Sequence, residues 1–125
     1  MIGIDLIKIS RMQQFMERFG NKALLRFLCE EEIKLVKNPK NAAGYWAVKE
    51  AFSKALGTGI GSQCSFYDIK IYKDAKGAPQ LAISDKIVTQ FHITNATLSI
   101  THDGEYAIAV VALKSSTPTN KIKQF

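Results

Sequence analysis

The segment from residue 42 to residue 61 constrains the fold most, because it joins a strong helical pattern to a glycine-dense loop. Apolar side chains recur there every three or four residues, which predicts a helix over residues 42–56; they are Tyr45, Val48, Ala51, Phe52 and Ala55. Gly57 is placed to end this helix. Glu50 and Lys54 lie one turn apart on another side. Such a pair is ordinarily solvated and contributes about 0.2–0.5 kcal/mol, so a functional role needs partners from elsewhere.

The size and composition of the chain indicate one soluble domain. Its 125 residues are enough to bury a core but too few for two domains. Cys29 and Cys64 form no metal-binding pattern, which favours a reduced, cytoplasmic setting. The N-terminus lacks a signal-peptide pattern, and no apolar run approaches the roughly 20 residues of a membrane span. We therefore expect neither export nor membrane insertion.

The N-terminal stretch predicts a strand with one unusual residue. Residues 1–9 alternate so that Ile2, Ile4 and Leu6 share one face and Asp5 lies on the other. A carboxylate among apolar neighbours is costly to bury unless it is paired, hydrogen-bonded or bound to a metal. An Asp that faces water at a strand edge, or pairs with an arginine, would have no such function. Both interpretations stay open from the strand alone.

The segments before the central helix are also helical. Ser10 is a capping residue for a helix that ends at Gly20, Asn21 is a cap for a second short helix, and residues 30–36 form a third. Asn41 is the expected N-cap of the central helix.

Beyond residue 61 the period changes to that of strands. We expect strands at 68–73 and 79–83, a helix at 85–91 capped by Ser84, and strands at 97–101 and 106–113. The apolar run 106–113 predicts a central strand buried on both faces. Residues 114–125 are polar and predict a loosely held tail after a single domain over residues 1–113. The expected fold is α+β, an antiparallel-rich sheet packed by the long central helix.

Three features together favour a site for a metal and phosphates: Asp5, the Glu50–Lys54 pair, and His102 in a predicted turn. Two carboxylates suit a hard cation such as Mg²⁺, and lysine and histidine suit the phosphates that accompany it. A histidine beside Asp and Gly is, taken alone, an ordinary turn residue. The loop 57–61 would let backbone N–H groups approach a phosphate, although it lacks the Gly-Lys-Ser/Thr of a Walker A loop.

The net charge of +6 predicts an acidic partner, which could be a nucleic acid, a phosphorylated cofactor or an acidic protein. Arg11 and Arg18 share the polar face of the first helix, which is either solvated or a docking surface for an acidic helix. The alternative function is a basic module that binds RNA, which needs aromatic side chains among basic ones on a sheet face. Tyr72 is the one strand aromatic clearly set among lysines, so we do not expect nucleic-acid binding.

From residue 2 to about residue 113, the chain resembles the holo-acyl-carrier-protein synthase group of 4′-phosphopantetheinyl transferases. Residues 2–7 (IGIDLI) are similar to the Gly-hydrophobic-Asp strand of that family, and residues 47–59 (AVKEAFSKALGTG) to its signature helix and loop. Residues 76–79 (KGAP) and 98–103 (LSITHD) continue the pattern in the family's order.

The resemblance implies an activity and a set of residue roles. The reaction is transfer of 4′-phosphopantetheine from coenzyme A to a serine hydroxyl of an apo acyl carrier protein, for fatty acid biosynthesis. Asp5 and Glu50 would hold Mg²⁺, and Glu50 would take the serine proton, directly or through a water. Lys54 would stabilise the charge of the leaving group, and coenzyme A would contact Lys54, Gly57 and His102.

The resemblance also implies a homotrimer whose active sites lie at subunit boundaries, with His102 supplied by the neighbouring subunit. The acidic carrier protein would dock on Arg11, Arg18 and Arg26. Three positions depart from the family pattern. Tyr45 replaces an arginine, Cys29 replaces a capping threonine, and Thr101 replaces a serine. The first departure removes an expected phosphate contact.

Overall fold

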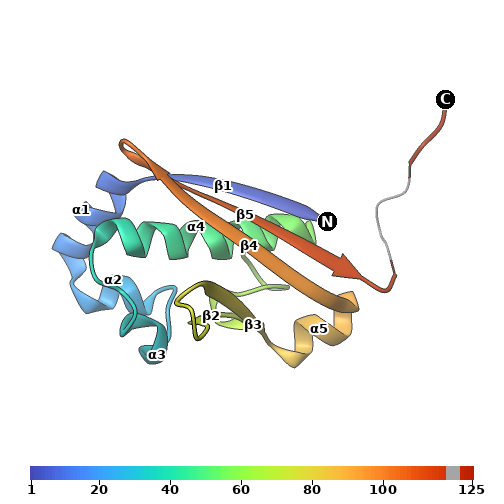
Figure 1. The fold of residues 1–125 in the computed structure, drawn as a ribbon, viewed down its shortest axis with the longest axis horizontal. Coiled ribbons are helices and arrows are strands. Elements are labelled where there is room, and N and C mark those ends of the chain that lie inside the picture. Colours follow the sequence, from blue (N-terminus) through green and yellow to red (C-terminus); the bar gives the residue numbers. More distant parts are fainter. Residues whose placement is uncertain (118–121) are drawn as a thin grey trace.

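The computed structural model describes residues 1–117 and 122–125 and has an α+β architecture (Figure 1). Along the chain, the elements are β1 (Ile2–Lys8), α1 (Ile9–Phe19), α2 (Asn21–Leu25), α3 (Glu30–Ile33), α4 (Pro39–Leu56), the 3₁₀ helix η1 (Phe66–Asp68), β2 (Ile69–Lys73), β3 (Pro79–Ile83), α5 (Asp85–Phe91), β4 (Ile93–Asp103) and β5 (Tyr106–Ser115). Among the described residues, the strands form an antiparallel sheet in the order β1-β5-β4 and a separate β2-β3 pair. The predicted fold class is confirmed.

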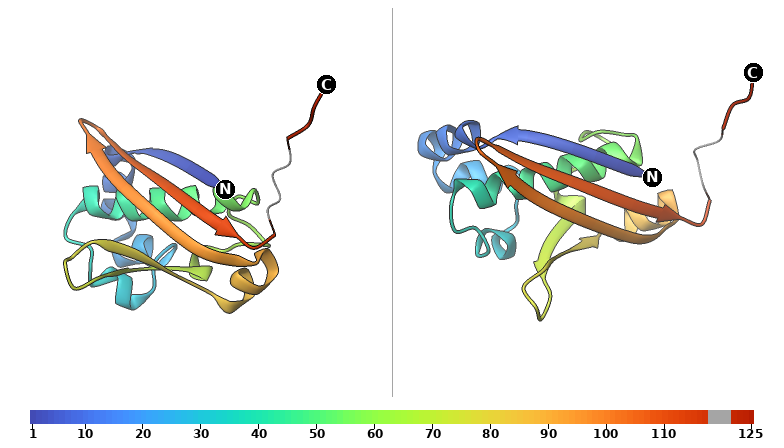
Figure 2. Two further views of the ribbon diagram at one scale, coloured as in Figure 1. Left: turned by 45° about the vertical axis from the view of Figure 1, so that its right-hand side comes forward. Right: turned by 45° about the horizontal axis from the view of Figure 1, so that its top comes forward.

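The long helix α4 packs against one face of the sheet, and the β2-β3 hairpin projects on the side of β4, away from β1 (Figure 2). The closest approach is at Gly3 of β1. A Cβ atom there would lie 1.9 Å from the Ala51 carbonyl oxygen and 2.7 Å from the Ala55 nitrogen. Because any side chain would push β1 away from α4, glycine at this position is what brings Asp5 within reach of the helix.

The strand β5 is central in its sheet, as predicted, but it is not buried on both faces. Its burial alternates, with Ala107, Ala109, Val111 and Leu113 buried toward α4. On the opposite face of β1, Ile2, Ile4 and Leu6 are 71%, 59% and 55% exposed. The prediction was wrong because α4 covers one face only, which leaves an apolar sheet face open to the surroundings of this chain.

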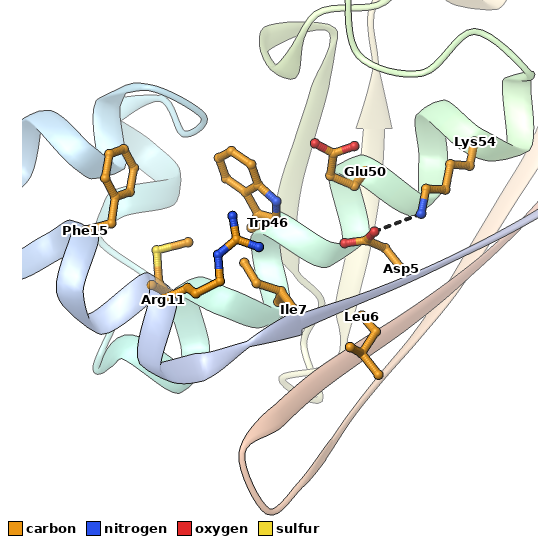
Figure 3. Close-up of a pocket in the computed structure, with 9 residues that line it drawn as sticks. Asp5, Leu6, Ile7, Arg11, Phe15, Trp46, Glu50 and Lys54 are labelled. Atoms are coloured by element: carbon orange, nitrogen blue, oxygen red, sulfur yellow. Dashed lines mark hydrogen bonds and ion pairs between the residues drawn. The ribbon is translucent and has the colours of Figure 1, made fainter.

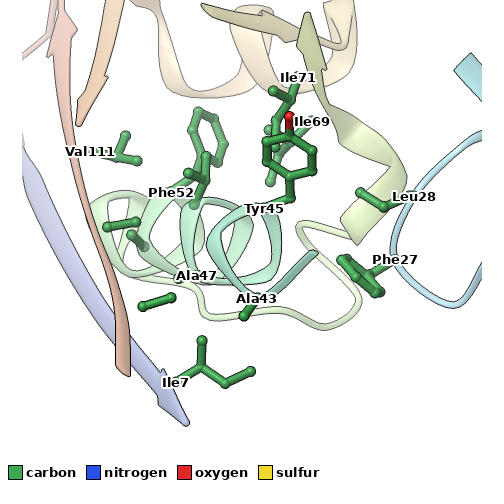
Figure 4. Packing of buried hydrophobic residues seen from close by; sticks show 14 of the residues in the cluster. Ile7, Phe27, Leu28, Ala43, Tyr45, Ala47, Phe52, Ile69, Ile71 and Val111 are labelled. Carbon is green, nitrogen blue, oxygen red and sulfur yellow. The ribbon is translucent and has the colours of Figure 1, made fainter. Parts of the chain in front are cut away.

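The core lies between α4, the sheet and the hairpin. Tyr45 points from α4 toward Ile69 and Ile71 of β2, and Phe52 and Val111 fill the neighbouring space (Figure 4). The position at which the family has an arginine therefore carries a core side chain, 2% exposed. Burial and the nearby Glu32 carboxylate raise the pKa of the Tyr45 hydroxyl. Among the described residues, this hydroxyl has no hydrogen-bond partner.

Several helix starts differ from the sequence prediction. The N-cap of α4 is Asn38, whose Oδ1 accepts the Asn41 N–H at 2.8 Å, so the helix begins three residues earlier with Pro39 at its first position. Ser10 lies inside α1, which follows directly from β1 with Lys8 as its N-cap. The N-cap of α2 is Gly20 and not Asn21. Lys8 and Asn38 have the extended backbone that is typical of an N-cap residue, whereas Gly20 has a positive φ of 59°.

Other predicted boundaries were correct or close. Ser84 caps α5, and Gly20 and Gly57 end α1 and α4. His102 is not in a turn but pairs with Ala107, because β4 begins at residue 93 and continues to residue 103.

The predicted loose tail begins too early. Lys114 and Ser115 belong to β5, and the Ser115 hydroxyl donates to the Phe91 carbonyl at 2.8 Å. The Ser116 N–H donates to the His92 carbonyl at 3.0 Å, so the ordered hydrogen bonding continues past residue 113. Residues 118–121, on which part of the tail prediction falls, lie outside the described residues.

Candidate active site

An open pocket of about 590 Å³ lies where β1 passes into α1 alongside α4 (Figure 3). Its lining comes from these three elements and consists of Asp5, Leu6, Ile7, Arg11, Met12, Phe15, Trp46, Glu50 and Lys54. The pocket therefore brings together Asp5, Glu50 and Lys54, the three residues that the sequence analysis singled out as catalytic.

Asp5 has its partner in Lys54, one helical turn beyond Glu50. The Lys54 ammonium donates to Asp5 Oδ1 at 2.9 Å and to the Ile4 carbonyl at 3.2 Å. The Asp5 side chain is 15% exposed and the Lys54 side chain 51%. The carboxylate in the strand is thus paired, with a lysine and not with an arginine, and the pair opens onto the pocket.

The Glu50 carboxyl group has a perturbed pKa. Burial raises its pKa above the usual value, and the negative charge of Asp5 raises it further, while Lys54 acts in the opposite direction. A carboxylate destabilised in its charged form binds a proton or a cation more readily. This environment suits a group that accepts a proton during a reaction.

Asp5 and Glu50 also fit a magnesium site. Mg²⁺ takes oxygen ligands and is commonly held by one or two carboxylates, with waters and substrate phosphates completing the shell. Among the described residues, no group of three or more His, Cys, Asp and Glu side chains could hold a metal. Two carboxylates in one pocket, one of them paired with an ammonium, match such a partial protein shell.

The glycine loop after α4 closes the helix end. Gly57 has φ +83° and donates its N–H to the Lys54 carbonyl at 3.0 Å. The N–H groups of Thr58 and Gly59 both donate to the Ser53 carbonyl, at 3.2 and 3.1 Å, and Gly61 donates to Cys64 at 2.9 Å. These four amides are occupied within the chain: the first three cap the C-terminus of α4, and the Gly61 amide closes the loop that follows. A contact between Gly57 and coenzyme A stays a prediction.

His102 lies outside the pocket lining of this chain. Its Nε2 is 3.2 Å from the Lys40 carbonyl oxygen, and the ring packs next to Gly44 near the start of α4. Of the predicted docking arginines, Arg11 lines the pocket, whereas Arg18 stacks over the Phe19 ring at 5.0 Å and Arg26 follows α2. One chain alone thus unites the carboxylates, Lys54 and Arg11 but not His102.

Sequence reasoning missed Trp46 as a pocket residue, although a signal was present. Trp46, Glu50 and Lys54 are spaced by four residues and therefore lie along one side of α4. It also missed Lys49, which is fully buried and pairs with Glu32 at 2.9 Å. At Cys29, the backbone N–H donates to Glu32 Oε1 at 2.9 Å, so Glu32 compensates at the start of α3 for the poor thiol cap.

The fold and the pocket define a class: an α+β protein whose pocket presents two carboxylates, a lysine and an arginine. A sequence profile of the 4′-phosphopantetheinyl transferase superfamily matches residues 1–111. The chain is 62% identical to the holo-[acyl-carrier-protein] synthase of Sulfurimonas denitrificans, covering 98% of this chain and 100% of that protein. It is 59% identical to that of Nautilia profundicola, covering 90% and 98%. The chain belongs to the 4′-phosphopantetheinyl transferase superfamily, as its sequence motifs predicted.

Solved structures agree with this assignment. The Helicobacter pylori holo-[acyl-carrier-protein] synthase in complex with coenzyme A superposes with a TM-score of 0.88 at 45% identity, covering 91% of this chain and all (100%) of that one. A Bacillus anthracis holo-(acyl-carrier-protein) synthase, in complex with CoA (3′,5′-ADP), gives a TM-score of 0.76 at 38% identity and covers 92% and 96%.

Proposed function

We propose that this protein transfers 4′-phosphopantetheine from coenzyme A to a serine hydroxyl of an apo acyl carrier protein. The observation that carries the proposal is the pocket that brings Asp5, Glu50 and Lys54 together, in a chain with 62% identity to a named holo-[acyl-carrier-protein] synthase. The structural similarity to a synthase solved with coenzyme A supports the donor.

In the proposed reaction, the serine oxygen attacks the β-phosphorus of the coenzyme A diphosphate. A new O–P bond forms, the bridging P–O bond breaks, and adenosine 3′,5′-bisphosphate leaves. Glu50 accepts the serine proton, for which its raised pKa makes it suitable. Lys54, with a half-exposed ammonium at the pocket, neutralises charge on the departing phosphate.

Asp5 and Glu50 are the residues that would hold Mg²⁺. When bound, the ion offsets the charge of the diphosphate and orients it for in-line attack. The chain's own contribution is to bring Asp5 of β1 and Glu50 of α4 into one pocket, through the close packing of Gly3 on α4.

The exposed apolar sheet face supports the proposal of a homotrimer. Ile2, Ile4 and Leu6 form a row of large side chains on β1, each more than half exposed, and they pair with the apolar Ala112, Val110 and Ile108 of β5. Contiguous apolar surface of this kind is typical of subunit interfaces. His102 lies outside the pocket of its own chain, next to Gly44 of α4, and in the proposed trimer a neighbouring subunit supplies it to each site.

An acidic carrier protein is the proposed partner of the positive surface. Arg11 stands at the pocket itself, so a carrier protein that docks there would bring its serine next to Glu50. Arg18 and Arg26 extend this charge along α1 and α2, and the net charge of +6 would speed the encounter.

The proposed setting is the cytoplasm, in fatty acid biosynthesis, where the reduced cysteines Cys29 and Cys64 are expected to persist. Among the described residues, no helix is long and apolar enough to cross a membrane.

The experiment that tests the function is intact-mass analysis of an apo acyl carrier protein incubated with this protein, coenzyme A and Mg²⁺. The expected result is a mass gain of one phosphopantetheine, abolished by EDTA and restored by excess Mg²⁺. No gain with several carrier proteins would contradict the proposal, and a gain that persists in EDTA would contradict its magnesium part.

A further inference from the structure

We propose that Lys49 is a positioning residue, which fixes Trp46 and with it one wall of the pocket. The inference rests on the proposed function only for its kinetic consequences. Lys49 directly precedes Glu50 in α4, but its side chain leaves the helix on a different side and enters the core, where it is fully buried.

The Lys49 ammonium makes three hydrogen bonds in this buried position. It donates to the Phe27 carbonyl at 2.7 Å, to Glu32 Oε1 at 2.9 Å and to the Phe66 carbonyl at 3.1 Å. An ammonium has three donors, so its capacity is used completely. The two carbonyls belong to segments far apart in the sequence, one after α2 and one in η1.

The rings of these same two residues hold Trp46. The centroid of the Phe27 ring lies 5.0 Å from that of the indole, with the two planes edge to face at 72°. The centroid of the Phe66 ring lies 4.8 Å from that of the indole, with an interplanar angle of 45°. The two phenylalanine rings are also in contact with each other, at 6.2 Å. Lys49 therefore binds the backbone of both residues whose side chains hold the indole, and Trp46 in turn lines the pocket with Glu50.

Glu32 extends the network to the hairpin and to α3. Its Oε1 also accepts the Cys29 N–H at 2.9 Å, and its Oε2 accepts the Ile71 N–H at 2.9 Å. Ring packing alone is weakly directional, whereas a buried charge tolerates few arrangements in which all of its hydrogen bonds are made. The Lys49–Glu32 pair thus selects one placement of the two rings, and through them one placement of Trp46.

The test uses Lys49→Met combined with Glu32→Gln, which removes both charges. The single Lys49→Met variant would leave the buried Glu32 unpaired and risks unfolding, and the double variant avoids this. Trp46 is the single tryptophan of the chain, so its fluorescence reports on the pocket wall directly. The measurements are acrylamide quenching of Trp46, thermal unfolding, and kcat and KM for phosphopantetheine transfer, all well below the unfolding temperature.

We expect the folded double variant to show increased quenching of Trp46 and a kcat/KM reduced about ten- to hundredfold, because small displacements of a pocket wall are costly to catalysis. Unchanged quenching and kinetics would overturn the proposal and leave the pair a stability element only. A kinetic loss without a change at Trp46 would overturn it as well. Absence of transfer by the wild-type protein would instead refute the proposed function, and quenching would still test the placement of Trp46.

Two further variants keep the test decisive. Phe66→Leu removes a ring that contacts Trp46 but keeps the backbone carbonyl that Lys49 binds. Quenching of Trp46 should therefore increase although the Lys49–Glu32 ion pair is intact. Unchanged quenching would count against the ring contact. Ile87→Val is the matched control, because Ile87 is also fully buried but lies on α5. It should lower the unfolding temperature while leaving quenching and kcat/KM unchanged, and a change in either would show that general destabilisation explains the effect.

Discussion

Two lysines of α4 form ion pairs of the same length in different environments, one with Glu32 of α3 and one with Asp5 of β1. The ammonium lies 2.9 Å from the carboxylate oxygen both in Lys49–Glu32 and in Lys54–Asp5. The first pair is 0% and 2% exposed, whereas the second is 51% and 15% exposed. The comparison shows that distance does not distinguish a pair buried in the core from a pair that opens onto the pocket. The two pairs differ in their solvent access and in their unused hydrogen-bonding capacity.

The buried pair has its donors and acceptors directed at backbone groups, so it has little left to offer a substrate. The open pair lies in a pocket beside Glu50, where a phosphate could compete for Lys54 and a cation for Asp5. We therefore expect changes to the buried pair to lower the free energy of unfolding strongly, and changes around the open pair to lower the rate.

The largest expected effect is at Glu50, which lies in the pocket beside the open pair. Glu50→Gln keeps the size of the side chain but removes the proton acceptor, so kcat should fall by about 10²–10⁴-fold. The measurement is the initial rate of transfer by mass spectrometry, with circular dichroism to confirm folding. A variant that retains more than a tenth of the wild-type kcat would exclude Glu50 as the base.

In the buried pair, Lys49→Met alone should lower the free energy of unfolding by about 3–5 kcal/mol, because Glu32 remains buried without its counterion. Urea denaturation followed by circular dichroism measures this change. A loss below about 1 kcal/mol would mean that Glu32 finds another partner or takes up a proton at little cost, and that the pair does not organise the core.

The difference between the two pairs was only partly predictable from sequence. The i, i+4 spacing placed Glu50 and Lys54 together, and the strand pattern marked Asp5, so both members of the open pair were singled out from the sequence. That Asp5 pairs with Lys54 was not predicted. Lys49 belongs to the same motif, yet nothing local marks it as buried. Its partners, Phe27, Glu32 and Phe66, lie 17 to 22 residues away and meet it only after the chain has folded.

Prediction of the fold from the sequence was limited in the same way. Local patterns predicted the strands, the hairpin, the central helix and its stop at Gly57. They did not predict that β5 would be open on one face, because this depends on how many layers cover the sheet. They also misplaced His102, since strand pairing extended β4 beyond its apolar residues. Whether His102 reaches a neighbour's pocket depends on assembly, which the local sequence does not encode.

A smaller effect on stability is expected at Lys54. Lys54→Met should reduce the free energy of unfolding by less than about 1 kcal/mol, because the Lys54 side chain is half exposed and its pair with Asp5 is screened by solvent and salt. Its kcat should nevertheless fall, since the leaving phosphate loses a cation. Lys86→Met is a matched control, because Lys86 of α5 is also half exposed and pairs with a less exposed carboxylate, that of Asp68. Equal kinetic losses in both variants would remove the special role assigned to Lys54.

The smallest expected effect is the pH dependence that Glu50 gives to stability. Its folded-state pKa is raised above the usual 4.5, chiefly by burial and then by Asp5. The folded protein therefore binds this proton more tightly than the unfolded chain does, and the contribution of Glu50 is fully present below pH 4.5. It is lost as the pH rises through the raised pKa. Glu50→Gln should accordingly be slightly more stable than the wild type near neutral pH, and this advantage should disappear at acidic pH. Urea denaturation of both proteins across this range measures the difference. An advantage that instead grew on acidification would mean that the Glu50 pKa is lowered, and that the open pair stabilises the carboxylate as firmly as the buried pair does.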